Sequence, residues 1–237
     1  MVMRSRRALL VMLLLTPALL SAQDLRIASY NVGSQHRDYM GLAKVINNFD
    51  VVAAEEVTNA GGLEKALGAL AEGWEAAISD TNAQALKQKE LIGFFYDERV
   101  ELYRMLGPYP DRGLFSRAPY GANFKVKGSP FSFNLIACHI DSAKGPQARA
   151  AEISRLGDVY AYFEKLTGNR GISIMAGDFG ERRIPFFGGQ QILDQDNDHI
   201  FVSANLRPRV ERADVLRTSR SDATDHCPVY IVLRAGP

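Results

Sequence analysis

The sequence predicts an α/β domain in which mixed β-sheets are covered by helices. Three observations predict it. Residues 25–54 have the pattern strand, helix, strand. Residues 74–140 contain apolar runs separated by short turn-rich segments, which is typical of hairpins. A long amphipathic helical segment at 146–168 precedes a further strand. Strands outnumber helices, and helices separate only some of the strands, so mixed sheets follow.

The first half of the chain supplies most of the predicted strands. Residues 25–30 alternate apolar and polar side chains, as a half-buried strand does. Apolar residues then recur at helical spacing, at Leu42, Val45, Ile46 and Phe49. An apolar strand is expected at 51–54 and a second helical segment at 63–70. Further strands are expected at 74–79, 90–96, 100–105, 122–126 and 131–140.

The second half is predicted to contain one long helix and three strands. Pro146 suits the first turn of this helix, and Gly168 suits a left-handed cap at its end. Four apolar side chains share one of its faces, namely Ile153, Leu156, Tyr160 and Phe163. The strands are expected at 172–176, 199–203 and 229–233. No repeat or charge run divides residues 23–237, so we expect one domain.

Residues 1–22 have the features of a secretory signal peptide. Arginines at 4, 6 and 7 precede an apolar run at 8–15, and small residues follow at Ser21 and Ala22. A membrane anchor is the alternative, but Pro17 interrupts the run, which falls short of the roughly 18 residues that a span needs. We expect cleavage after Ala22, a secreted or periplasmic location, and no stable membrane association afterwards.

Composition and charge exclude several classes of protein. The chain is 46% hydrophobic and 23% charged, the balance of a soluble globular protein rather than a collagen-like, coiled-coil or disordered one. Removing residues 1–22 takes away three arginines and no acid, so the formal net charge moves from +1 to −2. A histone-like polyanion binder is therefore excluded, and any contact with nucleic acid must come from a local patch.

The two cysteines, Cys138 and Cys227, are too few for a disulfide scaffold and form no CxxC pair. Each is next to a histidine, in Cys138-His139 and His226-Cys227. Neighbours on a strand point to opposite faces, so a histidine that faces a site places its cysteine in the core. We expect buried free thiols, with a disulfide as the alternative.

Polar side chains recur where the predicted strands end or begin: Asn31, Glu56, His139, Asp178 and the pair Asp225-His226. Active sites of α/β sheets favour that edge. Carboxylate and amide oxygens without a cysteine cluster suit Mg²⁺ or Mn²⁺. Two histidines beside such a metal could supply a general base and a general acid for water attack on a phosphodiester. Taken singly, each carboxylate could instead cap a helix or form a turn.

Several motifs together resemble the endonuclease/exonuclease/phosphatase superfamily, and most closely its deoxyribonuclease I branch. They are DLRIASYNVGS, VVAAEEV, KELIGFFYD, FSRAPYGANFKV, LIACHI, MAGDFGE, DNDHIFVS and TDHCPV. The resemblance runs from Asp24 to Leu233. It implies an α+β four-layer sandwich, with two mixed β-sheets packed face to face and helices on the outside.

The resemblance also implies a metal site and a histidine site. Glu56 would be the main metal ligand, with Asn31 near metal and phosphate and Asp225 as a further ligand. Glu55, where a glutamine is usual, is expected to be a solvated neighbour that points to the other face. The implied catalytic residues form a second set, in which acids orient the two histidines: Glu90 with His139, Asp198 with His226, and Asp178 at the reacting phosphate.

Three further positions are interpreted through the same resemblance. Arg117 would bind phosphate through its planar fork, with an exposed solubilising arginine as the alternative. His199 carries no family role and is expected to be structural. The family pattern Gly-Asp-Phe-Asn becomes Gly-Asp-Phe-Gly here, so Gly180 replaces a side chain that donates to the phosphate. Loss of one preorganised donor typically costs about 10²–10³ in rate.

The function implied is a secreted, divalent-metal-dependent phosphodiesterase, favoured as a DNase I-like endonuclease that uses Mg²⁺ or Mn²⁺. DNA is the expected partner, and the chain is expected to be a monomer. A structural Ca²⁺ cannot be assigned to particular residues. The alternatives are a phosphomonoesterase or a sphingomyelinase-like phospholipid phosphodiesterase of the same fold, and a binding protein weakened in catalysis by Gly180.

Overall fold

The computed structural model describes residues 24–33, 38–58, 60–79, 90–140, 143, 145–168, 172–185, 188–218 and 226–235. The expected signal peptide and Asp225 lie outside these residues, so the structure does not test them. Within the described residues, no helix has the length and apolarity needed to cross a bilayer.

Twelve strands of the described chain form two sheets of six. The first sheet has the order β11-β12-β1-β2-β4-β3, with β1 at Asp24–Asn31, β2 at Val51–Val57, β3 at Glu75–Ile78, β4 at Leu91–Tyr96, β11 at Val210–Val215 and β12 at Val229–Arg234. The second has the order β5-β6-β7-β8-β10-β9, with β5 at Val100–Pro108, β6 at Tyr120–Val126, β7 at Ser132–His139, β8 at Ser173–Asp178, β9 at Gln190–Gln195 and β10 at Asp198–Val202.

Each sheet is mixed in the same way. The central pairs β1–β2 and β7–β8 are parallel, and the other neighbouring strands are antiparallel. The carboxyl ends of a parallel pair therefore lie at the same edge as the amino ends of its antiparallel neighbours. This topology brings many separate chain segments to one edge of each sheet.

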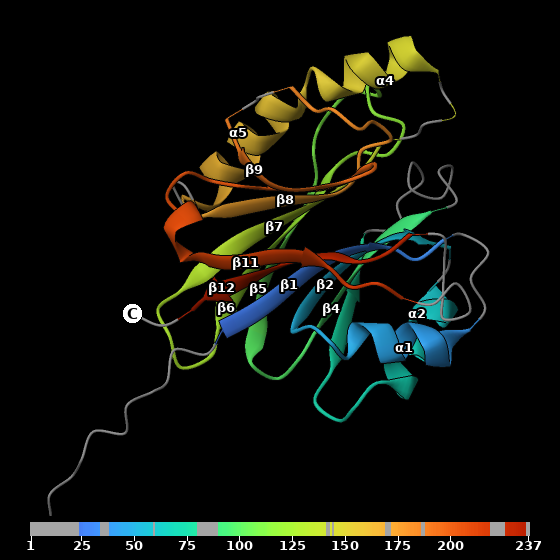
Figure 1. Ribbon diagram of the computed structural model, residues 1–237, viewed down its shortest axis with the longest axis vertical. Coiled ribbons are helices and arrows are strands. Elements are labelled where there is room, and N and C mark those ends of the chain that lie inside the picture. Colours follow the sequence, from blue (N-terminus) through green and yellow to red (C-terminus); the bar gives the residue numbers. More distant parts are fainter. Residues whose placement is uncertain are drawn as a thin grey trace, which may run out of the picture.

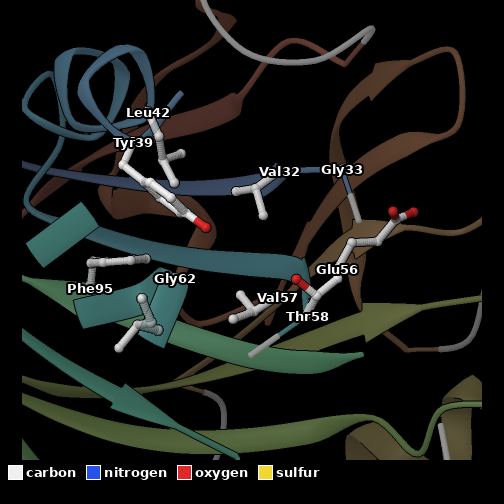
Figure 2. A pocket seen from close by; sticks show the side chains of 10 residues that line it. Val32, Gly33, Tyr39, Leu42, Glu56, Val57, Thr58, Gly62 and Phe95 are labelled. Atoms are coloured by element: carbon white, nitrogen blue, oxygen red, sulfur yellow. The ribbon is translucent and has the colours of Figure 1, made fainter. Parts of the chain in front are cut away.

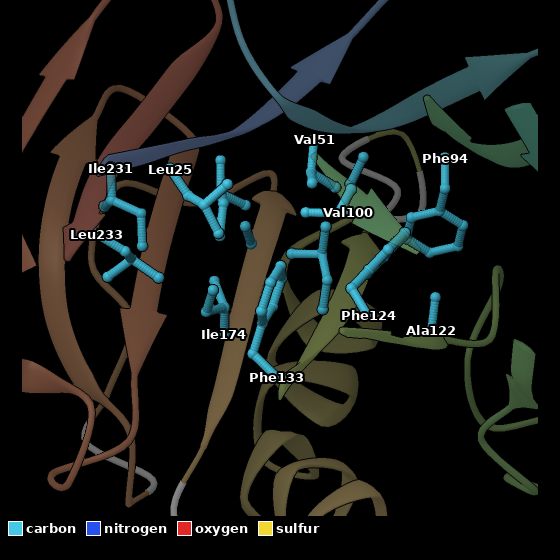
Figure 3. Packing of buried hydrophobic residues seen from close by; sticks show 14 of the residues in the cluster. Leu25, Val51, Phe94, Val100, Ala122, Phe124, Phe133, Ile174, Ile231 and Leu233 are labelled. Atoms are coloured by element: carbon cyan, nitrogen blue, oxygen red, sulfur yellow. The ribbon is translucent and has the colours of Figure 1, made fainter. Parts of the chain in front are cut away.

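Helices cover the outer faces (Figure 1), with α1 at Tyr39–Ile46 and α2 at Ala60–Ala69 on the first sheet, and α4 at Pro146–Ile153 and α5 at Leu156–Thr167 on the second. The inner faces pack against each other through buried side chains such as Leu25, Val51, Phe124, Phe133 and Ile231 (Figure 3). The four-layer sandwich expected from the sequence is confirmed.

The predicted helix at 146–168 is wrong in one respect, because the structure has two helices there. The break falls at Ser154 and Arg155. The Ser154 hydroxyl donates to the Ala151 carbonyl over 2.7 Å, a local bond that competes with regular helical pairing. The expected start and end hold: Pro146 opens α4, and Gly168 caps α5 with φ 64°.

Two strands were not expected from the sequence, β9 and β11. Each lies at the edge of its sheet and carries polar or charged residues, including Asp194 in β9 and Glu211 and Arg212 in β11. Charged edge strands discourage pairing with other chains, but they lack the apolar alternation that predicts a strand. A 3₁₀ turn at Arg207–Arg209 precedes β11.

Candidate active site

The two sheets bring almost all the predicted site residues to one edge. Asn31, His139 and Asp178 are the last residues of β1, β7 and β8, and Glu56 lies near the end of β2. The antiparallel neighbours contribute residues at their beginnings: Glu90 before β4, Asp198 at the start of β10 and His226 before β12. Sequence positions from 31 to 226 therefore meet in space.

Asn31 links the two sheets at this edge. Its side chain is buried, and Nδ2 donates to Glu56 Oε1 at 3.0 Å and to Asp178 Oδ2 at 3.2 Å. Its Oδ1 accepts from the backbone N–H of Gly33 at 3.0 Å. One amide thus holds two carboxylates that belong to different sheets, and the expected role of Asn31 as a metal ligand stays a prediction.

Glu56 has an unusual backbone. Its φ is 60°, in the left-handed region that non-glycine residues rarely adopt, and the pairing of β2 with β4 shifts between Ala54 and Val57. Such an irregularity re-aims a side chain, and strained residues of this kind cluster at functional sites. Here the carboxylate turns toward Asn31 and His139.

His139 lies between two carboxylates. Its Nε2 is 3.5 Å from Glu56 Oε1, and its Nδ1 is 3.8 Å from Glu90 Oε2. Glu90 Oε2 also lies 2.5 Å from an Arg117 nitrogen. Ligand atoms of Glu56, Glu90 and His139 all lie within 4.8 Å of one another, close enough to hold a metal ion together. The expected proximity of Glu90 and His139 is observed.

His226 forms the second acid–histidine pair. Its Nδ1 lies 2.9 Å from Asp198 Oδ2, within hydrogen-bonding distance, and its Nε2 lies 3.8 Å from Asp178 Oδ2. Burial raises the pKa of Asp198 above its usual value, while the hydrogen bond and charge of His226 oppose that rise. The other carboxylate oxygen of Asp178, Oδ1, accepts a hydrogen bond from the Gly180 N–H at 2.8 Å, and this bond fixes the carboxylate.

The expectation that Glu55 is solvated is wrong. It does point to the opposite face from the Val52 and Ala54 side chains, but that face is the space between the sheets, and the side chain is fully buried. The Ser29 hydroxyl donates to Glu55 Oε1 at 2.7 Å. Burial raises the pKa of Glu55 well above its usual value, and the nearby charges of Asp198 and Asp178 raise it further.

Arg117 is mostly buried and pairs with Glu90, which does not fit an exposed solubilising arginine. His199 is fully buried, as expected for a structural residue: Nε2 donates to the Glu181 carbonyl at 2.7 Å, and Nδ1 accepts from Gln191 at 3.1 Å.

Both cysteines are free, with Cys138 buried as expected, whereas Cys227 is only partly buried. Burial raises the pKa of the Cys138 thiol, which favours an inert core role.

A small pocket adjoins Glu56 on the outer side of the first sheet (Figure 2). It holds about 370 Å³ of empty space, counting the part open to solvent. Glu56 and Gly33 stand at one end, and Tyr39 and Leu42 face the pocket from α1. The other lining is mainly apolar. No sequence motif indicated this pocket, because its walls come from two helices, from two strands and from the segment that follows β1.

The chain is similar to known proteins in sequence and in fold. No family model matches the chain. A protein named deoxyribonuclease from Thioalkalivibrio sp. (strain K90mix) is 29% identical over 191 residues, which cover 74% of this chain and 51% of that protein. The chain thus spans about half the length of this relative.

Solved structures share the architecture. An endonuclease/exonuclease/phosphatase family protein from Bacteroides thetaiotaomicron superposes with TM-score 0.63 and 18% identity, covering 89% of this chain and 98% of that one. Truncated TDP2 from Caenorhabditis elegans superposes with TM-score 0.65 and 13% identity, covering 90% and 98%. At these identities the likeness concerns the fold.

The chain has the endonuclease/exonuclease/phosphatase fold, and the resemblance seen in its motifs is confirmed. Carboxylate oxygens and imidazole nitrogens converge at this edge in two groups that could each hold a metal ion, one of Glu56, Glu90 and His139 and one of Asp178, Asp198 and His226.

Proposed function

We propose that the chain is a secreted or periplasmic endonuclease that hydrolyses DNA with a divalent metal, Mg²⁺ or Mn²⁺, and acts as a monomer. One observation carries the proposal: two acid–histidine pairs, Glu90 with His139 and Asp198 with His226, stand at the same edge as the carboxylate of Glu56. Attack by water on a phosphodiester needs one group to take a proton and another to give one. The deoxyribonuclease relative favours DNA as the substrate.

The two pairs suit different proton transfers. Neutral His226 donates through Nδ1 to Asp198, which leaves Nε2 to accept a proton from the attacking water. His139, with a carboxylate near each ring nitrogen, is suited to hold a proton and deliver it to the leaving oxygen. The opposite assignment of base and acid uses the same geometry.

The metal and phosphate roles fall to the remaining residues. Glu56 would hold the metal, with Asn31 and Asp225 proposed as further ligands, and a bound divalent cation supplies positive charge that neutralises the phosphate. Asp178, which Asn31 and Gly180 hold in place, would orient groups at the reacting phosphate. Arg117 would bind phosphate oxygens after exchanging part of its contact with Glu90.

A substrate panel tests this proposal against its alternatives. Purified residues 23–237 are incubated with supercoiled plasmid, single-stranded DNA, RNA, sphingomyelin vesicles, a phosphomonoester and a chromogenic phosphodiester, each with Mg²⁺, Mn²⁺ or chelator. We expect metal-dependent nicking of plasmid. Hydrolysis of the phosphomonoester alone would favour an activity like that named for a structural neighbour, the mannosyl-6-phosphatase Bt3783 of Bacteroides thetaiotaomicron, which is 18% identical. DNA binding without hydrolysis would favour a binding protein.

A further inference from the structure

A buried acid outside the two histidine pairs contacts the loop that carries Arg117. Glu152 lies on α4 and is only 2% exposed, although glutamate is rarely buried without a partner. Its Oε1 accepts two hydrogen bonds from Ser116, one from the backbone N–H at 2.9 Å and one from the hydroxyl at 2.6 Å. Glu152 therefore fixes both the backbone and the side chain of Ser116.

Ser116 directly precedes Arg117, so this contact lies one residue from the site. Arg117 contacts Glu90, and Glu90 lies beside His139. The segment between β5 and β6 has no regular ladder to fix its direction. It is anchored by Phe115, whose ring is buried against the α4–α5 layer and whose N–H donates to Asp111 Oδ2, and at Ser116 by the two bonds to Glu152. The direction in which Arg117 leaves the backbone thus depends on Glu152.

The same helix reaches a second loop of the site. Arg149, one turn before Glu152, lies 3.4 Å from Glu181, in the segment that follows Asp178. Arg149 and Glu152 are three residues apart and share a face of α4. That face therefore contacts the Arg117 loop on one side and the Asp178 loop on the other.

We propose that Glu152 is a positioning residue, which holds Arg117 in the orientation that binds the reacting phosphate. The inference rests on the proposed function, because it assigns Arg117 to the phosphate. Removing the carboxylate leaves the partly buried Ser116 N–H without its acceptor and allows the loop to move. A displacement of about 1 Å in a positioned group can cost on the order of 10²-fold in rate.

The test compares Glu152→Ala, Glu152→Gln and Arg117→Ala with a matched buried control. The control is Asn134→Ala, which removes a buried hydrogen-bonding side chain of β7. Asn134 contacts Thr167 and Ser173 on the outer face of the second sheet and, within the described chain, contacts no loop of the site. kcat and KM are measured well below the melting temperature of every variant. We expect Glu152→Ala to lose about tenfold or more in kcat/KM, and Glu152→Gln, which keeps an accepting oxygen, to retain most of it.

A double-mutant cycle separates positioning from stability. On the Glu152→Ala background, Arg117→Ala should cost much less than in the wild type, because the arginine is already misplaced. The Asn134→Ala control should lower the melting temperature without changing turnover. Additive losses in the cycle, or equal turnover losses in Glu152→Ala and Asn134→Ala, would overturn the inference.

A measurement that does not need activity keeps this test independent of the proposed function. Amide hydrogen exchange at Phe115, Ser116 and Arg117 should rise in Glu152→Ala and stay near the wild-type value in Glu152→Gln. Unchanged exchange in Glu152→Ala would refute the positioning role. If exchange rises while the wild type cleaves none of the phosphate esters tested, Glu152 still positions the loop, but the proposed function and the phosphate-binding role of Arg117 both fail.

Discussion

Replacing Gly180 with asparagine adds a side-chain amide where the related motif has one. The structure makes the substitution feasible, because Gly180 has φ 60° and asparagine tolerates this left-handed region better than most residues. The Gly180 N–H already donates to Asp178, and a change of side chain leaves that bond in place. The new amide should then reach the phosphate that Asp178 is proposed to serve.

The gain in turnover and the loss of stability expected for Gly180→Asn can both be estimated. Loss of one preorganised donor costs about 10²–10³ in rate in measured cases, so a partial restoration should raise kcat by about tenfold, which corresponds to about 1.4 kcal/mol. KM should change less, since the donor acts mainly in the transition state. The backbone cost of about 1 kcal/mol should lower the melting temperature by about 2–4 °C.

The assay is steady-state cleavage of a chromogenic phosphodiester and of plasmid DNA, with melting temperatures measured in parallel. Gly180→Ala is the control, because it places a Cβ at the same φ of 60° and adds no donor, although its backbone cost is larger than that of asparagine. The reasoning is refuted if Gly180→Asn remains folded and turns over no faster than Gly180→Ala. In that case this site does not use the phosphate geometry of the related motif.

Three further predictions concern the metal, the histidines and the buried acid. Chelator should abolish hydrolysis, and Glu56→Gln should need far more Mg²⁺ for half-maximal rate, because an anionic oxygen ligand becomes neutral; full activity in excess chelator would contradict the metal mechanism. His139→Ala and His226→Ala should each lose several orders of magnitude in kcat, measured by single-turnover cleavage, and the double variant should be hardly worse, since residues that act as a unit are non-additive. Either histidine is a structural residue if its single variant turns over near normally. The raised pKa of Glu55 means that its contribution to stability is present below the ordinary glutamate pKa and is lost as pH rises through the raised one. Glu55→Gln should therefore gain melting temperature over the wild type as pH rises, and a constant difference across pH would count against a perturbed Glu55.

Local pattern was enough to predict the site edge. Asn31, His139 and Asp178 end apolar strands, and the carboxyl ends of parallel strands in one sheet meet. The motif resemblance added the face-to-face packing of the two sheets, which no local pattern encodes. The local pattern and the motif resemblance predicted the same edge because the strands beside the site are central and strongly apolar.

The features that the sequence did not predict have a common cause, because each of them depends on contacts with distant segments of the chain. Glu55 looked solvated because its burial depends on the second sheet, contributed by later residues. No motif in the sequence marked Glu152, because its partner, Ser116, lies 36 residues away. The edge strand β11 was missed because its pairing with β12, rather than its own apolar pattern, makes it a strand. Each depends on a contact that the local sequence does not carry.

The hydrogen bonds of Asn31 have a consequence for the order of folding. The atoms that they join lie 147 residues apart in the chain, one on each sheet. Neither sheet alone can contain the assembled edge, and contacts between residues so distant in sequence form slowly. The edge can therefore be complete only after both sheets have formed and packed together. A displacement of one sheet relative to the other would break these bonds and separate Glu56 from Asp178, while the strand pairing within each sheet stayed intact.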